Sequence, residues 1–340
     1  MDVLSESLLQ KPVIKTTNLS IGYGSKVLKS KIELSGLKGE QIAVIGANGS
    51  GKSTLLRTLA ALQPALSGSV ELFEKPMQDY SVKAKAKALS FVAATPLYDR
   101  YMTTEELVRL GRFPYSQMLG KIRKADKKII ENALEIVGLK HLSHTKITEI
   151  SDGERQKALI AGALAQDSPI VILDEPVSFL DPENSFAVLN ILKDLTEKQN
   201  KTVIYSTHDI SSALHRADKV WLFKDSNISE GSPEDLILNN SFDRLFNLPD
   251  IFFDKISSSF RQKTKLEKTL YYKDLSDNEN LLRGLKKTAK RLCFRAISAG
   301  NRQKPNILLS SDSEIFVLKN HKHIKVNDFY MLARILKDKT

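Results

Sequence analysis

The sequence is poor in cysteine, in long apolar runs and in sorting signals. Its 340 residues include one cysteine, Cys293, which excludes an intrachain disulfide and suits a reducing cytosol. No run of about eighteen apolar residues occurs, so the sequence predicts no transmembrane helix. Residues 1–10 lack a basic start followed by an apolar core, and we expect no secretion signal there. These absences predict a cytoplasmic protein with folded domains.

The positive charge of the chain is concentrated near its C-terminus. Residues 255–340 hold 20 Lys and Arg against 8 Asp and Glu, a net charge of +12, whereas the rest is close to neutral. A basic segment can attract nucleic acid or anionic lipid headgroups, but it can equally be the solvated surface of a small domain. The segment has no arginine-rich repeat, zinc-ligand spacing or aromatic-interleaved basic motif, so nucleic acid is not expected as a partner.

A glycine-rich turn joins an apolar run at 41–45 to a helix predicted over 53–62. Glycines let the backbone approach phosphate oxygens, and N–H groups at a helix start attract anions. Lys52 can reach the β- and γ-phosphates of a nucleotide, and the Ser53 hydroxyl can ligate Mg²⁺. The alternative is an ordinary glycine-rich turn between a strand and a helix, which would not require the full Gly-x-x-x-x-Gly-Lys-Ser pattern. The residues predicted to bind the nucleotide here are Gly46, Asn48, Gly49, Ser50, Gly51, Lys52, Ser53 and Thr54.

Two acids and a histidine follow two further apolar runs. Asp174 and Glu175 end the run at 169–173, which is typical of a central parallel strand and places both carboxylates at its C-terminal end. Asp174 can hold Mg²⁺ through water, and Glu175 can act as the base for the water that attacks the γ-phosphorus. His208 follows the next predicted strand, 202–207, and its imidazole can bond the γ-phosphate and the attacking water. Adjacent acids or a lone histidine would mean little without the phosphate-binding turn.

Ser151 and Gly153 open a helix predicted over 153–166. A serine at this position is often only an N-cap. Its hydroxyl, the Gly153 amide and the helix dipole can also form a second phosphate-binding end. If the helical part of the chain that contains Ser151 projects outward, Ser151 and Gly153 cannot reach the phosphate-binding turn of their own chain. Two copies arranged head to tail solve the geometry, so we expect a homodimer.

These motifs, taken in order, resemble the ATP-binding cassette (ABC) ATPases over residues 12–240. Residues 46–54 match the Walker A motif of that family, 150–156 its signature motif, which includes Glu154, and 170–176 its Walker B motif. The segment 179–181, ending in Asp181, is similar to the D-loop, and His208 is similar to the switch histidine. Tyr23 resembles the aromatic residue that stacks on adenine, although a strand-surface residue is the alternative. The resemblance implies ATP and Mg²⁺ as cofactors.

The expected fold class is α/β: a P-loop NTPase core of ABC type with an antiparallel β subdomain and an inserted helical subdomain. Strands are expected over 13–23, 27–34 and 69–73, and helices over 104–111, 125–137 and 185–198. The ATPase domain is expected at 12–248, with the helical subdomain at about 95–166. Residues 249–340 are predicted to form a small basic α+β appendage. We expect its helix at 277–292, strands at 306–310 and 314–319, and Asn327 as the N-cap of a last helix through 337.

The segment Glu106-Leu107-Val108-Arg109-Leu110-Gly111-Arg112-Phe113-Pro114-Tyr115 resembles one found in the ATPases of iron–siderophore, haem and vitamin B12 importers. The resemblance implies polytopic membrane permease subunits, a substrate-binding protein and a peripheral place on the inner face of the cell membrane. An ordinary amphipathic helix is the alternative. A non-transport ABC protein, an exporter ATPase and a regulatory module that binds ATP without hydrolysing it remain as rival functions.

Two positions depart from the family pattern. Ala94 lies where the family has a glutamine that ligates Mg²⁺ and senses the membrane partner. Asp152-Gly153-Glu154 replaces Gly-Gly-Gln in the signature and adds acids near a bound triphosphate, where they would weaken anion binding unless Arg155 and Lys157 offset them. Neither departure affects Lys52 or Glu175, so hydrolysis is still expected.

Overall fold

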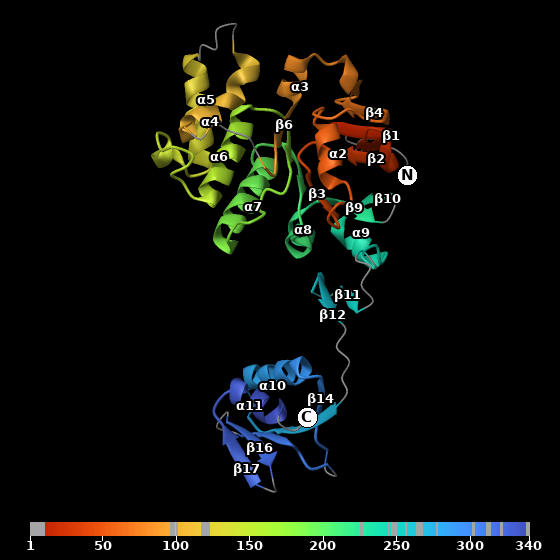
Figure 1. Cartoon of the computed structure of the whole chain (residues 1–340), viewed down its shortest axis with the longest axis vertical. Coiled ribbons are helices and arrows are strands. Elements are labelled where there is room, and N and C mark those ends of the chain that lie inside the picture. The colour runs from red at the N-terminus through yellow and green to blue at the C-terminus, as the bar shows by residue number, and fades with distance from the viewer. Residues whose placement is uncertain are drawn as a thin grey trace, which may run out of the picture. The chain divides into compact units, whose positions relative to one another are not determined.

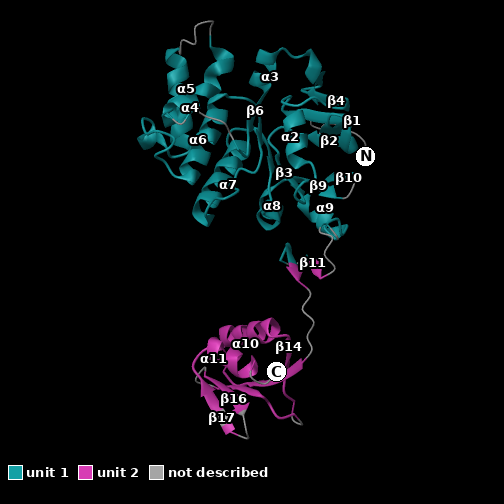
Figure 2. Cartoon of the chain, in the orientation of Figure 1, with its two compact units in different colours: residues 1–247, 253–260 teal, residues 248–252, 261–340 magenta. Residues whose placement is uncertain are grey.

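The computed structural model describes residues 11–95, 99, 101–116, 123–224, 227–243, 245, 250–255, 257–262, 268–276, 278–300, 303–310, 314–319 and 322–337. The chain divides into two compact units (Figure 2). Unit 1 comprises residues 1–247 and 253–260, and unit 2 comprises residues 248–252 and 261–340. Residues 253–260 therefore belong to unit 1, although they follow the boundary expected at 248/249. The domain boundary at 248/249 stays a prediction.

Unit 1, which includes the red-to-green part of the ribbon in Figure 1, is built around a six-stranded sheet with the order β10-β9-β3-β8-β7-β6. Its strands are β3 (Gln41–Gly46), β6 (Leu89–Val92), β7 (Ile170–Leu173), β8 (Thr202–Ser206), β9 (Lys219–Lys224) and β10 (Asn227–Gly231). Neighbouring strands run parallel, except that β9 and β10 are antiparallel. The apolar runs at 41–45, 169–173 and 202–207 are therefore confirmed as neighbouring strands.

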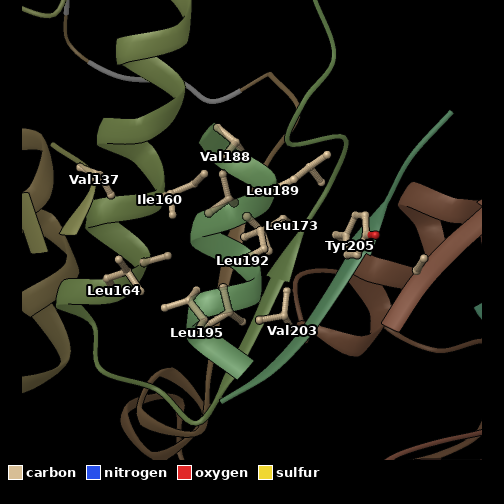
Figure 3. Packing of buried hydrophobic residues seen from close by; sticks show 14 of the residues in the cluster. Val137, Ile160, Leu164, Leu173, Val188, Leu189, Leu192, Leu195, Val203 and Tyr205 are labelled. Atoms are coloured by element: carbon tan, nitrogen blue, oxygen red, sulfur yellow. The ribbon is translucent and has the colours of Figure 1, made fainter. Parts of the chain in front are cut away.

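The central strands are buried on both faces because alternate side chains enter two different hydrophobic cores. Ile42 and Val44 pack with α2 and the antiparallel sheet, whereas Ala43 and Ile45 pack with the helical lobe and α7. Figure 3 shows the second core, in which apolar side chains of α6 and α7 approach those of β7 and β8. Burial on both faces explains why these strands read as continuous apolar runs in the sequence.

A second sheet in unit 1 has the order β2-β1-β4-β5 and is antiparallel. Its strands are β1 (Ile14–Tyr23), β2 (Lys26–Gly36), β4 (Ser67–Leu72) and β5 (Lys75–Pro76). Leu19 and Ile21 of β1 are fully buried and fix this sheet on the core. The antiparallel subdomain expected from the sequence is confirmed.

Several helices of unit 1 begin at a side chain that accepts one of their first free N–H groups. At Thr103 and Ser151, a glutamate three residues later completes a capping box. The helices are α2 (Lys52–Leu59), α3 (Val82–Ala88), α4 (Thr104–Arg109), α5 (Lys124–Ile136), α6 (Asp152–Ala165), α7 (Pro182–Glu197), α8 (Ile210–Arg216) and α9 (Pro233–Leu238), with short 3-10 helices η1 (Met77–Asp79), η2 (Leu110–Tyr115) and η3 (Lys140–Leu142). The helix predicted over 104–111 ends earlier, at Arg109, where η2 continues the chain. In the part of the chain that the structure describes, no helix has the length and apolarity needed to cross a bilayer.

Unit 2 is a five-stranded mixed sheet with two helices. Its elements are β13 (Lys268–Asp274), α10 (Glu279–Arg291), β14 (Phe294–Ser298), β15 (Ile307–Leu309), β16 (Ile315–Lys319), β17 (Lys322–Val326) and α11 (Phe329–Lys337). The strand order is β14-β13-β15-β16-β17, and a further pair, β11 (Ile251–Asp254) and β12 (Ser259–Gln262), forms a separate two-stranded sheet. The α+β composition expected from the sequence is correct, but β13, β14 and β17 were not predicted.

The start of the last helix also differs from the sequence prediction. The sequence predicts Asn327 as its N-cap, but α11 begins at Phe329, and the carboxylate of Asp328 accepts the Met331 N–H at 2.7 Å. Both residue types are good caps. The Phe329 ring lies where a Cβ on Gly284 of α10 would be, so the glycine lets the start of α11 pack closely on α10.

Candidate nucleotide-binding site

The phosphate-binding turn connects β3 to α2 in the geometry that the sequence predicts. Gly49 and Gly51 have φ angles of 74° and 106°, in the left-handed region that favours glycine. A Cβ on Gly46 would lie 2.6 Å from the Cβ of Phe223, so this position has no room for a side chain. The turn therefore directs backbone N–H groups and the N-terminus of α2 toward one point, where an anion is favoured.

Lys52 lies inside this turn. Its Nζ donates to the Gly46 carbonyl at 2.8 Å and to the Ala47 carbonyl at 3.2 Å, and the residue is 5% exposed. Burial lowers the pKa of the Lys52 ammonium, and the carboxylates of Glu175 and Asp174 oppose this shift. Ser50, in the same turn, has a buried hydroxyl that makes no hydrogen bond to a described residue. The turn thus holds a cation beside two acids.

Asp174 follows β7 and faces the first turn of α2. Its Oδ1 accepts hydrogen bonds from the Ser53 hydroxyl at 3.0 Å and from the Ser206 hydroxyl at 2.8 Å. Hard oxygen donors of this kind are what Mg²⁺ prefers. The described residues contain no cluster of three His, Cys, Asp or Glu side chains that could hold a metal ion alone. A bound Mg²⁺ would fit at Ser53 and Asp174, with its other ligands supplied by nucleotide and water.

Glu175 is held from both sides by neighbouring side chains. Its Oε1 lies 2.6 Å from Nε2 of His208, and its Oε2 accepts the Ser178 hydroxyl at 2.8 Å. Burial raises the pKa of Glu175, but the hydrogen bonds from Ser178 and His208 and the charges of His208 and Lys52 outweigh it, so the pKa lies below its usual value. The carboxylate is therefore ionised at neutral pH and able to accept a proton.

These groups border a cavity of about 530 Å³. Its lining comprises Tyr23, Lys26, Leu28, Asn48, Gly49, Gly51, Lys52, Ser53, Thr54, Glu175 and His208. The Tyr23 hydroxyl lies 2.8 Å from the Thr54 hydroxyl, while the Tyr23 side chain remains 52% exposed. The cavity thus joins an exposed aromatic ring to the phosphate-binding turn and to a held carboxylate, which is the arrangement that a nucleoside triphosphate requires.

Comparison with known proteins agrees with this geometry. The family model described as "ABC transporter" matches residues 30–178. An ABC transporter ATP-binding protein, MJ0873 of Methanocaldococcus jannaschii, is 37% identical over 252 residues, which cover 74% of this chain and 87% of the relative. The chain belongs to the ABC transporter family. The iron(3+)-hydroxamate import ATP-binding protein FhuC of Bacillus subtilis is 33% identical over 69% of this chain and 88% of its own length.

Solved structures of ABC proteins share the fold. An inward-facing metal-chelate type ABC transporter matches with a TM-score of 0.63 and 28% identity, covering 74% of this chain and 96% of that one. The ATP-binding cassette MJ0796, solved as a dimer in a post-hydrolysis state with ADP and Pi, matches with a TM-score of 0.58 and 26% identity over 65% of this chain and 98% of that one. The P-loop ABC fold class is therefore confirmed, and the chain is an ATPase of this family.

The ABC signature residues do not meet the phosphate-binding turn. Among the described residues, those lining the cavity include neither Ser151, Gly153 nor Glu154 of α6, nor Asp181 at the start of α7. Ser151 is exposed, and its hydroxyl donates to the Glu154 carboxylate at 2.8 Å and accepts the Glu154 N–H at 3.3 Å. Asp181 caps α7 by accepting the Asn184 N–H at 2.8 Å. Their role in binding nucleotide stays a prediction.

The two extra acids of the signature are engaged by local partners. Asp152 pairs with the Arg155 guanidinium at 2.6 Å, and that guanidinium also bonds the carbonyls of Ile147 and Ile150. Glu154 closes the capping box with Ser151, whose hydrogen bonds hold the pKa of Glu154 below its usual value. Arg155 thus offsets Asp152, as the sequence suggested, while Glu154 serves the start of the helix.

Ala94, at the position where the ABC family has glutamine, is exposed just after β6, and Thr95 beside it is exposed too. Asp174, on the neighbouring strand, donates its N–H to the Val92 carbonyl at 2.9 Å, so β6 ends next to the predicted metal ligand. An alanine methyl cannot ligate a metal. That the metal shell has one protein oxygen fewer at this position stays a prediction.

The importer-like segment, residues 106–115, is partly buried in the helical lobe through Leu107, Val108 and Arg112. A Cβ on Gly111 would lie 2.0 Å from the Gly162 carbonyl, so the backbones touch there. The Arg112 guanidinium is buried, pairs with Asp126 at 2.9 Å and donates to the Ala165 carbonyl at 2.7 Å. Phe113 is 76% exposed. The motif therefore holds the lobe together and leaves one aromatic side chain at its surface.

Ser206 and Ser178 are site residues that were not predicted from the sequence. The Ser206 hydroxyl is fully buried; it donates to Asp174 and accepts the Glu175 N–H at 2.8 Å. Glu175 has a φ of 51°, a conformation that costs energy in a residue with a side chain, and this hydrogen bond holds it. The sequence signal that could have identified Ser206 is its position. It lies two residues before His208, on the strand that pairs with β7.

We expect Ser206→Ala to lower kcat about 10-fold and to raise the Mg²⁺ concentration needed for half-maximal activity, because both acids lose a positioning hydroxyl. Ser206→Thr keeps the hydroxyl and should restore most of the rate. Ser168→Ala is the matched control, since its hydroxyl is equally buried but bonds the Ile170 carbonyl at the other end of β7. Phosphate release measured across Mg²⁺ concentrations tests this. If Ser168→Ala lowers kcat as much as Ser206→Ala does, the role of the Ser206 hydroxyl is only structural.

Proposed function

We propose that this ATPase binds ATP and Mg²⁺ in the cavity and hydrolyses ATP with Glu175 as the base. The observation that carries this proposal is the Glu175 carboxylate, fixed between Ser178 and His208 at the edge of the phosphate-binding turn. Lys52 binds the β- and γ-phosphates, together with the backbone of residues 46–54. Tyr23 offers its exposed ring to the adenine.

In hydrolysis, Glu175 takes a proton from water while the water oxygen bonds to the γ-phosphorus. The bond from that phosphorus to the β–γ bridging oxygen breaks, and ADP leaves. His208, within hydrogen-bond distance of Glu175, orients the water and bonds the γ-phosphate. Mg²⁺, held by Ser53 and Asp174, would neutralise charge on the phosphates. Lys52 and the helix N-terminus stabilise the charge that shifts to the leaving oxygen.

A second copy of the chain completes the site. Ser151, Gly153 and Glu154 are placed at the N-terminus of α6, outside the cavity of their own chain. In a head-to-tail pair, each α6 N-terminus would face the γ-phosphate bound by the other copy, and Asp181 would lie at the interface. The dimeric relative with ADP and Pi supports this arrangement. ATP would close the pair and hydrolysis would reopen it.

The pair would drive uptake of a metal chelate, such as an iron–siderophore, haem or a cobalamin. The names of the iron(3+)-hydroxamate import relative and of the metal-chelate type transporter support this substrate class. The partners would be polytopic permease subunits in the membrane and a substrate-binding protein outside it. The ATPase would lie on the inner face of the membrane, with Phe113 at the lobe surface toward the permease.

Uptake of radiolabelled chelates tests the proposed substrate class. Cells that lack this chain should fail to accumulate one of three probes, ferric hydroxamate, haem or cobalamin. The wild-type gene should restore uptake of that probe, whereas Glu175→Gln should not, although the variant accumulates to the same level. Unchanged uptake of all three probes in the deletion strain would contradict the proposed function.

A further inference from the structure

The outer face of α10 in unit 2 is strongly basic. Its exposed cations are Arg283, Lys286, Lys287, Lys290 and Arg291. At about 100° per residue they fall within an arc of about 140° around the helix. The same arc holds one acid, Glu279, which pairs with Arg283 at 2.7 Å. The other four cations make no ion pair with any described residue, and the Lys286 ammonium lies 6.0 Å from the centre of the Tyr272 ring. The charge of Lys287, Lys290 and Arg291 is therefore available to a partner.

The opposite side of α10 is buried in the hydrophobic core of unit 2. Leu285 and Ala289 are fully buried and pack in one core with Leu332 and Leu336 of α11. The helix therefore has no free apolar face to insert into a partner. Any interaction through its outer face must be electrostatic, with anions that approach from solvent.

We infer that this α10 face docks on anionic phospholipid headgroups at the membrane surface. Unit 2 carries 19 Lys and Arg against 9 Asp and Glu, whereas unit 1 is close to neutral, so the attraction is concentrated in the small unit. Each basic residue near an anionic membrane surface adds to binding, and several together suffice for peripheral docking. Membership of a transporter family brings the chain to a membrane, and this choice of partner rests on the proposed function.

Nucleic acid fits the face less well. Single strands are bound by basic grooves that also offer aromatic rings for base stacking. The exposed arc of α10 holds only Lys, Arg, Asn and Glu side chains, so it offers no ring. Duplex DNA, which binds through phosphates alone, is therefore the alternative that the test must separate.

Vesicle co-sedimentation of the full-length protein provides the test. Vesicles with 30% phosphatidylglycerol in phosphatidylcholine should bind the protein at about 0.1 M salt, where the Debye length is about 10 Å. Pure phosphatidylcholine vesicles should not bind it, and affinity for the anionic vesicles should fall at least about 10-fold at 0.5 M salt. Binding to duplex DNA that is tighter than to anionic vesicles at the same salt would overturn the inference.

The triple variant Lys287→Gln/Lys290→Gln/Arg291→Gln should weaken vesicle binding about 100-fold, because three of the five cations are lost. The matched control replaces three exposed lysines of α5, Lys124, Lys127 and Lys128, by glutamine and should bind as the parent does. If both variants lose the same affinity for anionic vesicles, the binding depends on the overall charge of the protein and not on α10, and the inference is overturned. ATP hydrolysis in solution should be unchanged in the α10 variant, so this result is independent of the proposed catalytic site.

Discussion

Replacing Glu175 by glutamine is expected to lower ATP turnover about 1,000-fold while leaving ATP binding intact. Glutamine has the shape of the glutamate and can still accept hydrogen bonds, but it cannot take a proton from water, and general-base catalysis is worth roughly 10²–10⁴-fold. Lys52 and the backbone of the phosphate-binding turn, which bind the triphosphate, are untouched. Steady-state phosphate release and calorimetric titration with ATP separate the two effects.

A suitable control is Glu197→Gln at the end of α7. That carboxylate pairs with Lys193 at 3.5 Å on the surface, and its loss should leave turnover within about 2-fold of the parent, because exposed pairs contribute little. Parental turnover in the Glu175→Gln protein would mean that another group accepts the proton, and the assignment of the base would be wrong.

Ser151→Asp should reduce turnover about 100-fold without weakening the fold. Aspartate is as good an N-cap as serine and still accepts the Glu154 N–H, so α6 keeps its first turn, although the hydrogen bond from the serine hydroxyl to the Glu154 carboxylate is lost. Its carboxylate would, however, face the γ-phosphate of the other copy in place of a hydrogen-bond donor, and removing one such donor costs about 10²–10³-fold. In the Glu175→Gln background, ATP should drive the parent into dimers seen by light scattering, and Ser151→Asp should abolish them.

The matched control for this change is Ser81→Asp. Ser81 caps α3 by accepting the Ala84 N–H at 3.2 Å, so the same substitution is made at the same kind of position. Its dimerisation and turnover should equal those of the parent. Dimers that persist in the Ser151→Asp/Glu175→Gln protein would contradict the proposal that a second chain completes the nucleotide site.

Much of the site was predictable because its parts are encoded by short segments. The turn at 46–54 needs glycines with positive φ, and these are read directly from the residue types. Buried parallel strands appear as apolar runs, and the residue after such a run lies at the C-terminal edge of the sheet. The residue pattern is therefore enough to place Asp174 and Glu175 beside Lys52, and the carboxylates do influence the pKa of that lysine.

The pairing of side chains from distant segments could not be derived this way. Ser206 reaches Asp174 because β8 lies next to β7, and strand order is set by how the whole sheet packs. Arg112 is buried against Asp126, 14 residues away, a pairing that the residue pattern does not predict. The cap of α11 is Asp328 rather than Asn327, a choice between two good caps that the residue types do not decide.

The sequence by itself determined that the chain binds a nucleotide phosphate, since that depends on residue types within one turn and the elements beside it. It also determined the strands and helices next to the nucleotide-binding turn, because burial on one or two faces leaves a local pattern, whereas β6, β9 and β10 were not predicted. Only the tertiary structure decided that the Ser206 hydroxyl bonds both acids, that Arg112 is buried against Asp126, and that one side of α10 packs against α11. Those features depend on distances between segments far apart in the chain, and packing alone sets such distances.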